Sequence, residues 1–373
     1  MAYLFPIIFS IICIIVYDMH RTEKFSRIMF WGMCVYLILL FGLSDDLGYD
    51  TTHLYHPAYQ SFPTFASADM WDRLEEYSGF GYGFQFFILI FKTLGLPWWC
   101  FQLAAAGIIN LTVFYFINRH LNYRFIAILL YITCLSMRLN VEIIRQSLAM
   151  MVFLMSYPFL TKRQWGYFFI SVLVATLFHT SAFMLLLVPL MYLMRIDINR
   201  RLIYAFVAMS IMVYLTSLYL YDVSKIFGST YSEKIIYYAY TRRYERNLNY
   251  YIYHSLCNAL LPLAVGCYYK FILKKDIPFS KIIAILPLLL PGILAFGESF
   301  IRLGYYFLPF FIFSSAELIG EQIHRRELKN KLCGIVICVV LMVSYSYELI
   351  KSTTISDKYY PYRTILTHTE QAR

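Results

Sequence analysis

The sequence predicts an all-α, polytopic integral membrane protein with about 12 transmembrane helices, and two observations carry this prediction. Of the 373 residues, 60% are hydrophobic and only 14% are charged, whereas a soluble domain carries about 25% charged residues. Apolar runs of roughly 17–22 residues also recur along the chain between short charged loops, which is the pattern of membrane-spanning helices. We therefore expect residues 1–373 to form a single integral-membrane domain.

The hydrophobic runs place the spans in order along the chain. We predict them near residues 2–17, 28–43, 98–117, 124–137, 146–160, 166–178, 180–194, 202–221, 252–270, 279–296, 300–319 and 332–349. The first run has no basic residue before it and no small-residue cleavage site after it, so we interpret it as a retained span rather than a signal peptide.

Basic residues concentrate in short loops between these spans. The loops are RTEKFSR, NRHLNYR, TKR, RIDINRR, KFILKKD and HRRELKNK. Placing all six in the cytoplasm gives a consistent alternation with the N-terminus outside. The net charge of +10 therefore indicates topology rather than a nucleic-acid partner, and loops 44–82 and 222–251 are expected to be extracytoplasmic.

Residues 83–117 allow more than one assignment of membrane crossings. This stretch is long enough for two short spans, yet the alternation requires an odd number of crossings. We therefore predict that residues 84–95 form a re-entrant or interfacial segment on the outer side, which is tolerated where the segment is buried in protein or lines a cavity.

Four ionisable residues fall at or near bilayer depth, close to one face of the predicted membrane domain: Arg138, Arg145, His179 and Arg302. Such a residue costs about 2.5–3.5 kcal/mol on insertion scales, so it is a functional candidate by default. Arg138, Glu142 and Arg145 have the spacing of one helical face, and arginine makes forked contacts with phosphate oxygens. The alternative is a structural pair between Glu142 and one arginine.

His179 and Arg302 each have a structural alternative as well. His179 could act as a general base towards a sugar hydroxyl or donate to a phosphate, or it could bond a backbone carbonyl at a helix break. Glu298 lies four residues before Arg302, so it either orients that guanidinium for a ligand or forms a purely structural pair with it.

The two outer loops add weaker candidates for sugar or headgroup binding. Asp50 and Tyr55 combine a carboxylate with an aromatic face, which suits sugar rings, although a solvated loop has the same composition. Arg242 and Arg243 lie among tyrosines, a mixture that suits anionic glycans or lipid headgroups but also an interfacial belt. The eight cysteines are scattered through apolar runs, and we expect neither a metal site nor a cofactor.

Four short motifs occur in a recognisable order: GYDTTHLY, IRQSLA, FHTSA and RLGYYF. Over roughly residues 40–310 this set resembles the EpsG family of exopolysaccharide-biosynthesis membrane proteins, which is related to Wzy-type polymerases. The resemblance points to Asp50, Tyr55, Arg145, Gln146, His179, Ser181, Arg302 and Tyr306. The chain departs from the family where an arginine often precedes the first motif, because Asp45 and Asp46 stand there.

The resemblance implies a glycosyltransferase-C-like polymerase in the bacterial cytoplasmic (inner) membrane. It would join oligosaccharides carried on polyprenyl diphosphate at the outer face, with a chain-length regulator and a flippase as partners. From the residue pattern and the resemblance together, we expect Arg145, Arg302 and His179 to be catalytic. The expected substrate-binding residues are Asp50, Tyr55, Arg138, Glu142, Gln146, Arg242, Arg243, Glu298 and Tyr306.

Three other functions stay open. An O-antigen-ligase-like transferase would use the same donor with another acceptor, and a flippase would move the lipid-linked sugar across the membrane. A membrane acyltransferase is disfavoured because Met184 stands where an HxxxxD motif needs aspartate.

Overall fold

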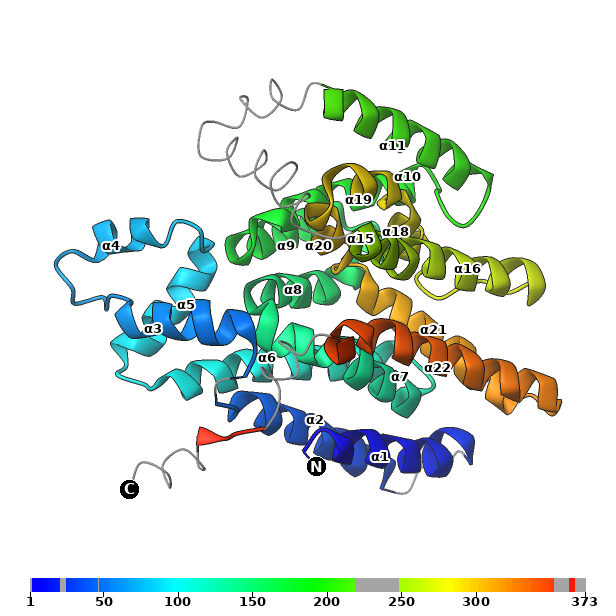
Figure 1. Cartoon of the computed structure of the whole chain (residues 1–373), viewed down its shortest axis with the longest axis horizontal. Helices are drawn as coiled ribbons and strands as arrows, with labels where there is room; N and C mark the ends of the chain where they lie inside the picture. The colour runs from blue at the N-terminus through cyan, green and yellow to red at the C-terminus, as the bar shows by residue number, and fades with distance from the viewer. Residues whose placement is uncertain (1, 21–24, 46, 219–247, 352–361, 366–373) are drawn as a thin grey trace. The chain divides into compact units, whose positions relative to one another are not determined.

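Helices form nearly all of the described part of the chain. The computed structural model describes residues 2–20, 25–45, 47–218, 248–351 and 362–365. Among these residues the only β pairing is one isolated antiparallel bridge, between Ser44 and Thr364. The chain divides into two compact units, residues 1–186 with 316–373 and residues 187–315, and each is described by itself. Figure 1 shows the helices coloured along the chain.

The first unit contains most of the N-terminal half of the chain and the last helix. Its α-helices are α1 (Leu4–Cys13), α2 (Ser26–Gly42), α3 (His56–Ser61), α4 (Met70–Glu76), α5 (Tyr82–Thr93), α6 (Trp98–His120), α7 (Arg124–Tyr131), α8 (Ile144–Thr161), α9 (Trp165–Phe178) and α22 (Leu328–Lys351). Its π-helical turns are η1 (Ile14–Met19), η2 (Thr51–Tyr55), η3 (Ile132–Ser136) and η4 (Arg138–Glu142). The 3₁₀ segment η5 (Thr180–Leu187) follows α9.

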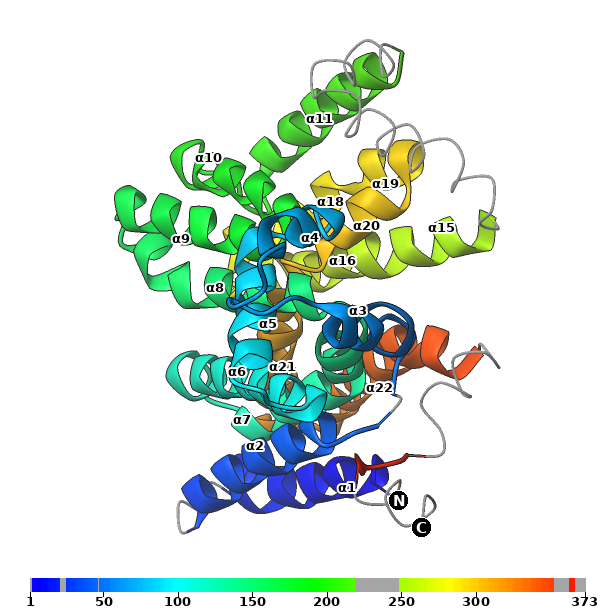
Figure 2. The same ribbon diagram turned by 90° about the vertical axis from the view of Figure 1, so that its left-hand side faces the viewer.

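Four helices of the first unit pack side by side in the order α2, α6, α8, α9 (Figures 1 and 2). A stripe of residues spaced four apart on α6 is fully buried, and it comprises Phe101, Ala105, Ile109, Val113 and Ile117. That spacing gives one continuous apolar face along the helix. Helix α6 is therefore the central element of this unit.

A buried polar cluster lies beside this stripe. Asn110 on α6 donates to Asn140 Oδ1 at 2.8 Å, and the Tyr131 hydroxyl donates to Asn110 Oδ1 at 2.8 Å. Asn140 also donates to the carbonyl of Ser136 at 2.8 Å. Because an unsatisfied buried polar group costs about 1–3 kcal/mol, these mutual bonds fix η3 and η4 against α6.

Two buried carboxylates hold the start of α7. Asp18 accepts the backbone N–H groups of Phe125 and Ile126, both at 2.9 Å. Glu317 accepts those of Asn122 and Tyr123, at 2.5 and 3.1 Å. Acceptors at a helix N-terminus satisfy donors that have no partner within the helix. Sequence reasoning did not single out either acid.

The backbone of segment 138–145 differs from the prediction. The predicted segment was a short link in which Arg138, Glu142 and Arg145 share one helical face. Residues Arg138–Glu142 form a π-helical turn, in which Ile143 N–H bonds the Arg138 carbonyl at 3.1 Å. Ile143 then leaves helical geometry at φ −115° and ψ 41° before α8 begins. The assumption of one regular helix through Arg138, Glu142 and Arg145 is therefore wrong, and the turn satisfies backbone groups that lipid could not.

The predicted outer loop 44–82 is also largely helical. It contains η2, α3 and α4, and the Tyr59 hydroxyl donates to the carbonyl of Leu96, between α5 and α6, at 2.7 Å. Burial raises the pKa of Tyr59 to about 12. The 12 residues of α5 span about 18 Å, shorter than the roughly 30 Å hydrocarbon core. This length suits a segment that does not cross the membrane.

The second unit is built from shorter helices. They are α10 (Val188–Leu193), α11 (Arg200–Leu218), α15 (Leu248–Ser255), η7 (Leu256–Leu260), α16 (Leu261–Cys267), η8 (Tyr268–Ile272), α17 (Ser280–Ile283), α18 (Ile285–Leu288), α19 (Leu290–Phe296) and α20 (Glu298–Gly304). Helix α21 (Leu308–His324) begins in this unit and ends in the first.

Over its described residues, every predicted span coincides with a helix or a run of consecutive helices. Length and apolar composition suffice for crossing a membrane in three described helical stretches, 98–120, 248–272 and 328–346. The bent pair α20 and α21, which meet at 50°, would make a fourth. The other predicted spans fall on helices that are shorter, interrupted or, like α8 and α11, long enough but not among these candidates, so the number of about 12 spans stays a prediction.

Candidate functional site

The first motif of the sequence docks on the turn that carries Arg138 and Glu142. Glu142 accepts the backbone N–H of Tyr49 at 3.0 Å and that of Asp50 at 3.4 Å. The hydroxyl of Thr51 donates to the carbonyl of Val141 at 2.5 Å. Glu142 therefore positions the segment that contains Asp50, a role that neither the ligand-binding nor the ion-pair interpretation anticipated.

Gly48 makes this close docking feasible. Its backbone has φ +85°, and a Cβ added there would meet the Cβ and carbonyl oxygen of Val141, each at 3.0 Å. Glycine alone adopts this conformation without steric cost and leaves that space open. The close packing against Val141 thus explains why a glycine stands at the first position of the GYDTTHLY motif.

Arg145 begins α8 and reaches back to the loop before α5. Its Nη1 donates to the carbonyl of Gly79 at 2.5 Å, and its guanidinium carbon lies 4.7 Å from the centre of the Phe80 ring and 5.8 Å from that of Tyr55. These cation–π contacts hold the charge in place. The Nε is buried and has no hydrogen-bond partner among the described residues, while the side chain as a whole is half-buried.

The loop segment Ser78–Gly81 joins Arg145 to the neighbourhood of His179. A Cβ on Gly81 would collide with the carbonyl oxygens of Leu177 and Phe178 at the end of α9, and a Cβ on Gly83 would lie 2.9 Å from the Leu177 Cβ. Two glycines therefore let the start of α5 approach the end of α9. Arg145 contacts one part of this segment, and the residue before His179 contacts another.

His179 sits where α9 ends, in extended geometry at φ −151° and ψ 119°. Its Nδ1 lies 2.7 Å from the Ser181 hydroxyl. When Nδ1 donates to Ser181, Nε2 carries the lone pair that a general base needs. The structure thus places His179 at a helix break, as expected, and pairs it with a residue that the FHTSA motif also contains.

Arg302 and Glu298 form the expected pair in the second unit. Both Nε and Nη2 of Arg302 donate to Glu298 Oε1, at 3.2 and 2.8 Å. Glu298 is buried, whereas the Arg302 side chain is 34% exposed, so a donor can face a ligand. Tyr306, directly after this helix, is fully buried.

The other sequence candidates occupy different places. Gln146 is buried on α8 behind Arg145, and Arg138 is half-buried on η4. Arg242 and Arg243 lie outside the described residues. Sequence reasoning missed Gly79 and Phe80 as contacts of Arg145; the available signal was Gly81, because glycine permits the close backbone approach found there.

Comparison with known proteins identifies the family. The EpsG family model matches residues 28–364. The chain belongs to the EpsG family. The resemblance drawn from the four motifs is thereby confirmed, and together with the apolar helices it indicates a multi-pass membrane protein of the polymerase type related to exopolysaccharide synthesis. Neither the curated proteins nor the solved structures contain a significant match.

Proposed function

We propose that this EpsG-family protein is a polysaccharide polymerase of the bacterial cytoplasmic membrane. It would transfer a glycan from a polyprenyl-diphosphate-linked oligosaccharide to a sugar hydroxyl at the outer face. Family membership supports the reaction class. About 12 spans, a glycosyltransferase-C-like arrangement, and partnership with a flippase and a chain-length regulator belong to the same proposal.

The observation that carries the proposal is the convergence on the Ser78–Gly81 segment. Arg145 bonds the Gly79 carbonyl, and the end of α9, which leads into His179, packs against Gly81. A fixed cation and a candidate base are thus tied to one short loop. This is the pair of groups that transfer from a diphosphate donor to a hydroxyl requires.

Arg145 and His179 would act on different parts of the reaction. A bond forms between the acceptor oxygen and the anomeric carbon, while the bond from that carbon to the diphosphate oxygen breaks. The diphosphate leaves with the electron pair, so a guanidinium that neutralises its developing charge lowers the barrier. The acceptor hydroxyl loses its proton, which His179 would take. The Glu298–Arg302 pair belongs to the second unit, and its catalytic role stays a prediction from the sequence.

Deletion of the chain in its own cell tests this function. Loss of long polymer, with accumulation of a single repeat on the polyprenyl carrier, is the expected result. Accumulation of preformed polymer on the carrier would indicate a ligase instead. Accumulation of repeats confined to the inner leaflet would indicate a flippase, and either result would refute the proposal.

A further inference from the structure

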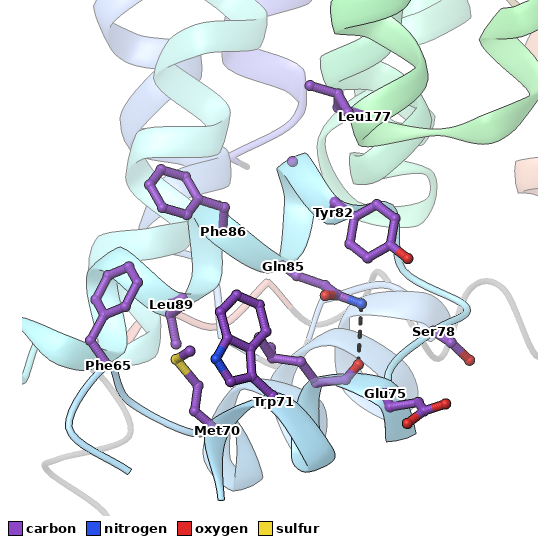
Figure 3. A pocket seen from close by; sticks show the side chains of 12 residues that line it. Phe65, Met70, Trp71, Glu75, Ser78, Tyr82, Gln85, Phe86, Leu89 and Leu177 are labelled. Atoms are coloured by element: carbon purple, nitrogen blue, oxygen red, sulfur yellow. Dashed lines mark hydrogen bonds between the residues drawn. The ribbon is translucent and has the colours of Figure 1, made fainter. Parts of the chain in front are cut away.

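An apolar groove lies next to the Ser78–Gly81 segment, entirely within the first unit. Its volume is about 770 Å³, and it is lined by α4, α5 and the end of α9 (Figure 3). Residues of α4 and the start of α5 fall in the region predicted to lie outside the membrane, and α5 is the predicted interfacial segment. The groove therefore belongs at the level of the lipid headgroups and upper chains.

Large apolar side chains converge on this groove. Trp71 is 76% exposed, Phe86 55% and Phe65 49%, and Leu89 closes the wall between them. Exposed apolar side chains are ordinary on a membrane protein, but these line one hollow rather than an even lipid-facing surface. In Figure 3 these side chains gather at one end of the groove.

The polar side chains that line the groove either form hydrogen bonds within its wall or lie at the end away from the large apolar side chains. The Gln85 amide nitrogen donates to the carbonyls of Leu74, Tyr77 and Phe80, at 3.4, 2.8 and 3.2 Å. These bonds commit its donors to the protein. Ser78 and Glu75 lie at the other end of the groove (Figure 3). The apolar end thus suits hydrocarbon better than a sugar, whose hydroxyls need partners.

The polar end of the groove adjoins the charged site. Ser78 lines the groove, and the next residue, Gly79, accepts the hydrogen bond from Arg145 Nη1. The carboxylate of Glu75 would repel a phosphate placed inside the groove, so an anionic group belongs on the Arg145 side of Ser78. A ligand that fits both features has a long apolar chain and an anionic head.

We propose that this groove binds the isoprenoid chain of the lipid-linked donor and that the diphosphate then lies against Arg145. This inference rests on the proposed function, since that function supplies the donor. A bilayer is as apolar as the groove, so moving the chain gains little hydrophobic free energy. The groove instead orients the donor, which places its diphosphate correctly for reaction.

The test combines labelling with kinetics in the full chain, reconstituted in nanodiscs. A polyprenyl diphosphate with a photoreactive group on its chain should label α4 and α5, as located by mass spectrometry. Leu177→Trp, which narrows the groove, should lower this labelling about tenfold, at the lower end of the effect of steric mismatch in a hydrophobic pocket. The same substitution should raise the KM for a long-chain donor by a similar factor. The KM for a donor with only two isoprene units should be unchanged.

Leu173→Trp is the matched control, because Leu173 lies one turn earlier on α9, is similarly exposed at 56% against 47% for Leu177, and does not line the groove. Equal effects of the two variants would overturn the proposal, as would equal labelling by a photoreactive phosphatidylglycerol. Labelling outside the groove in a protein that still polymerises would refute the groove alone. Groove labelling in a protein that makes no polymer would refute the proposed function and leave the groove as a lipid site.

Discussion

At the scale of single residues, Arg145 and His179 are held by different kinds of contact, which suit a fixed cation and a base. Arg145 is held by one backbone carbonyl and two aromatic rings, an arrangement that orients a planar guanidinium. His179 Nδ1 lies 2.7 Å from the hydroxyl of Ser181 in the 3₁₀ segment that follows α9, and this contact sets the orientation of the ring. These contacts lead to two predictions.

Arg145→Lys should lose most activity although the charge is kept. Lysine cannot reproduce a forked contact with two phosphate oxygens, nor stack flat on Phe80. We expect a fall of about 10²–10³-fold in polymer formation, the range for removing one donor that stabilises developing charge. Arg138→Lys, expected to be milder, is the control. Near wild-type polymer from Arg145→Lys at equal protein level would reduce this residue to a structural role.

His179→Gln should abolish polymer formation and leave donor binding largely intact, since the arginines hold the diphosphate. Loss of a general base costs about 10²–10⁴ in rate, which single-turnover transfer on purified, folded protein can measure. If His179 only caps the helix break, glutamine should retain activity and lower protein yield. Full single-turnover activity would therefore exclude the base.

At the scale of elements, the decisive feature is how the segment 48–55 docks on η4. Gly48→Ala tests this docking, because the added Cβ would meet Val141. Gly95→Ala is the matched control: Gly95 also has positive φ, at +67°, but a Cβ there meets nothing within 4 Å. Both variants carry the cost of a left-handed alanine, about 1–2 kcal/mol.

The difference between the two variants isolates the docking contact. We expect Gly48→Ala to lower the thermal stability further than Gly95→Ala and to expose residues 44–61 to protease. It should also lower activity, since Asp50 would move with the segment. Equal stability and equal proteolysis in the two variants would contradict the docking role.

Sequence periodicity predicted the position of the helices well and their detailed geometry poorly. Each apolar run became a helix or a series of helices, because run length and hydrophobicity are local properties. The π-helical turn at Arg138–Glu142 depends on Asn140 meeting Asn110, a contact between residues 30 positions apart. No local pattern reports such a contact, so the predicted shared face of Arg138, Glu142 and Arg145 failed.

In the candidate site too, local patterns predicted some features and missed contacts between residues far apart in the sequence. Motifs identified Arg145, His179 and the Glu298–Arg302 pair, and i,i+4 spacing correctly gave the contact within that pair. The partners of Arg145 on the SGFG segment come from distant sequence. Nothing in the sequence indicated the donors to Glu142 that the structure shows, because its carboxylate accepts backbone N–H groups of residues about 90 positions away.

At the scale of the whole molecule, the account requires loops 44–82 and 222–251 and the N-terminus to be extracytoplasmic. A single cysteine replacing Arg73, in a background without the eight native cysteines, should react with an impermeant reagent in intact cells. A cysteine replacing Lys162, in a predicted cytoplasmic loop, should react only after permeabilisation. The reverse pattern would place the candidate groups on the wrong side for an outer-face reaction.

The most direct test of the central claim is reconstitution of the purified chain with a defined lipid-linked repeat. The account predicts products of two or more repeats on one polyprenyl carrier, formed together with free polyprenyl diphosphate, and their loss in Arg145→Lys. Release of polyprenyl diphosphate should match the number of new glycosidic bonds. A folded wild-type protein that binds the donor but forms no product longer than one repeat would contradict the assignment as a polymerase.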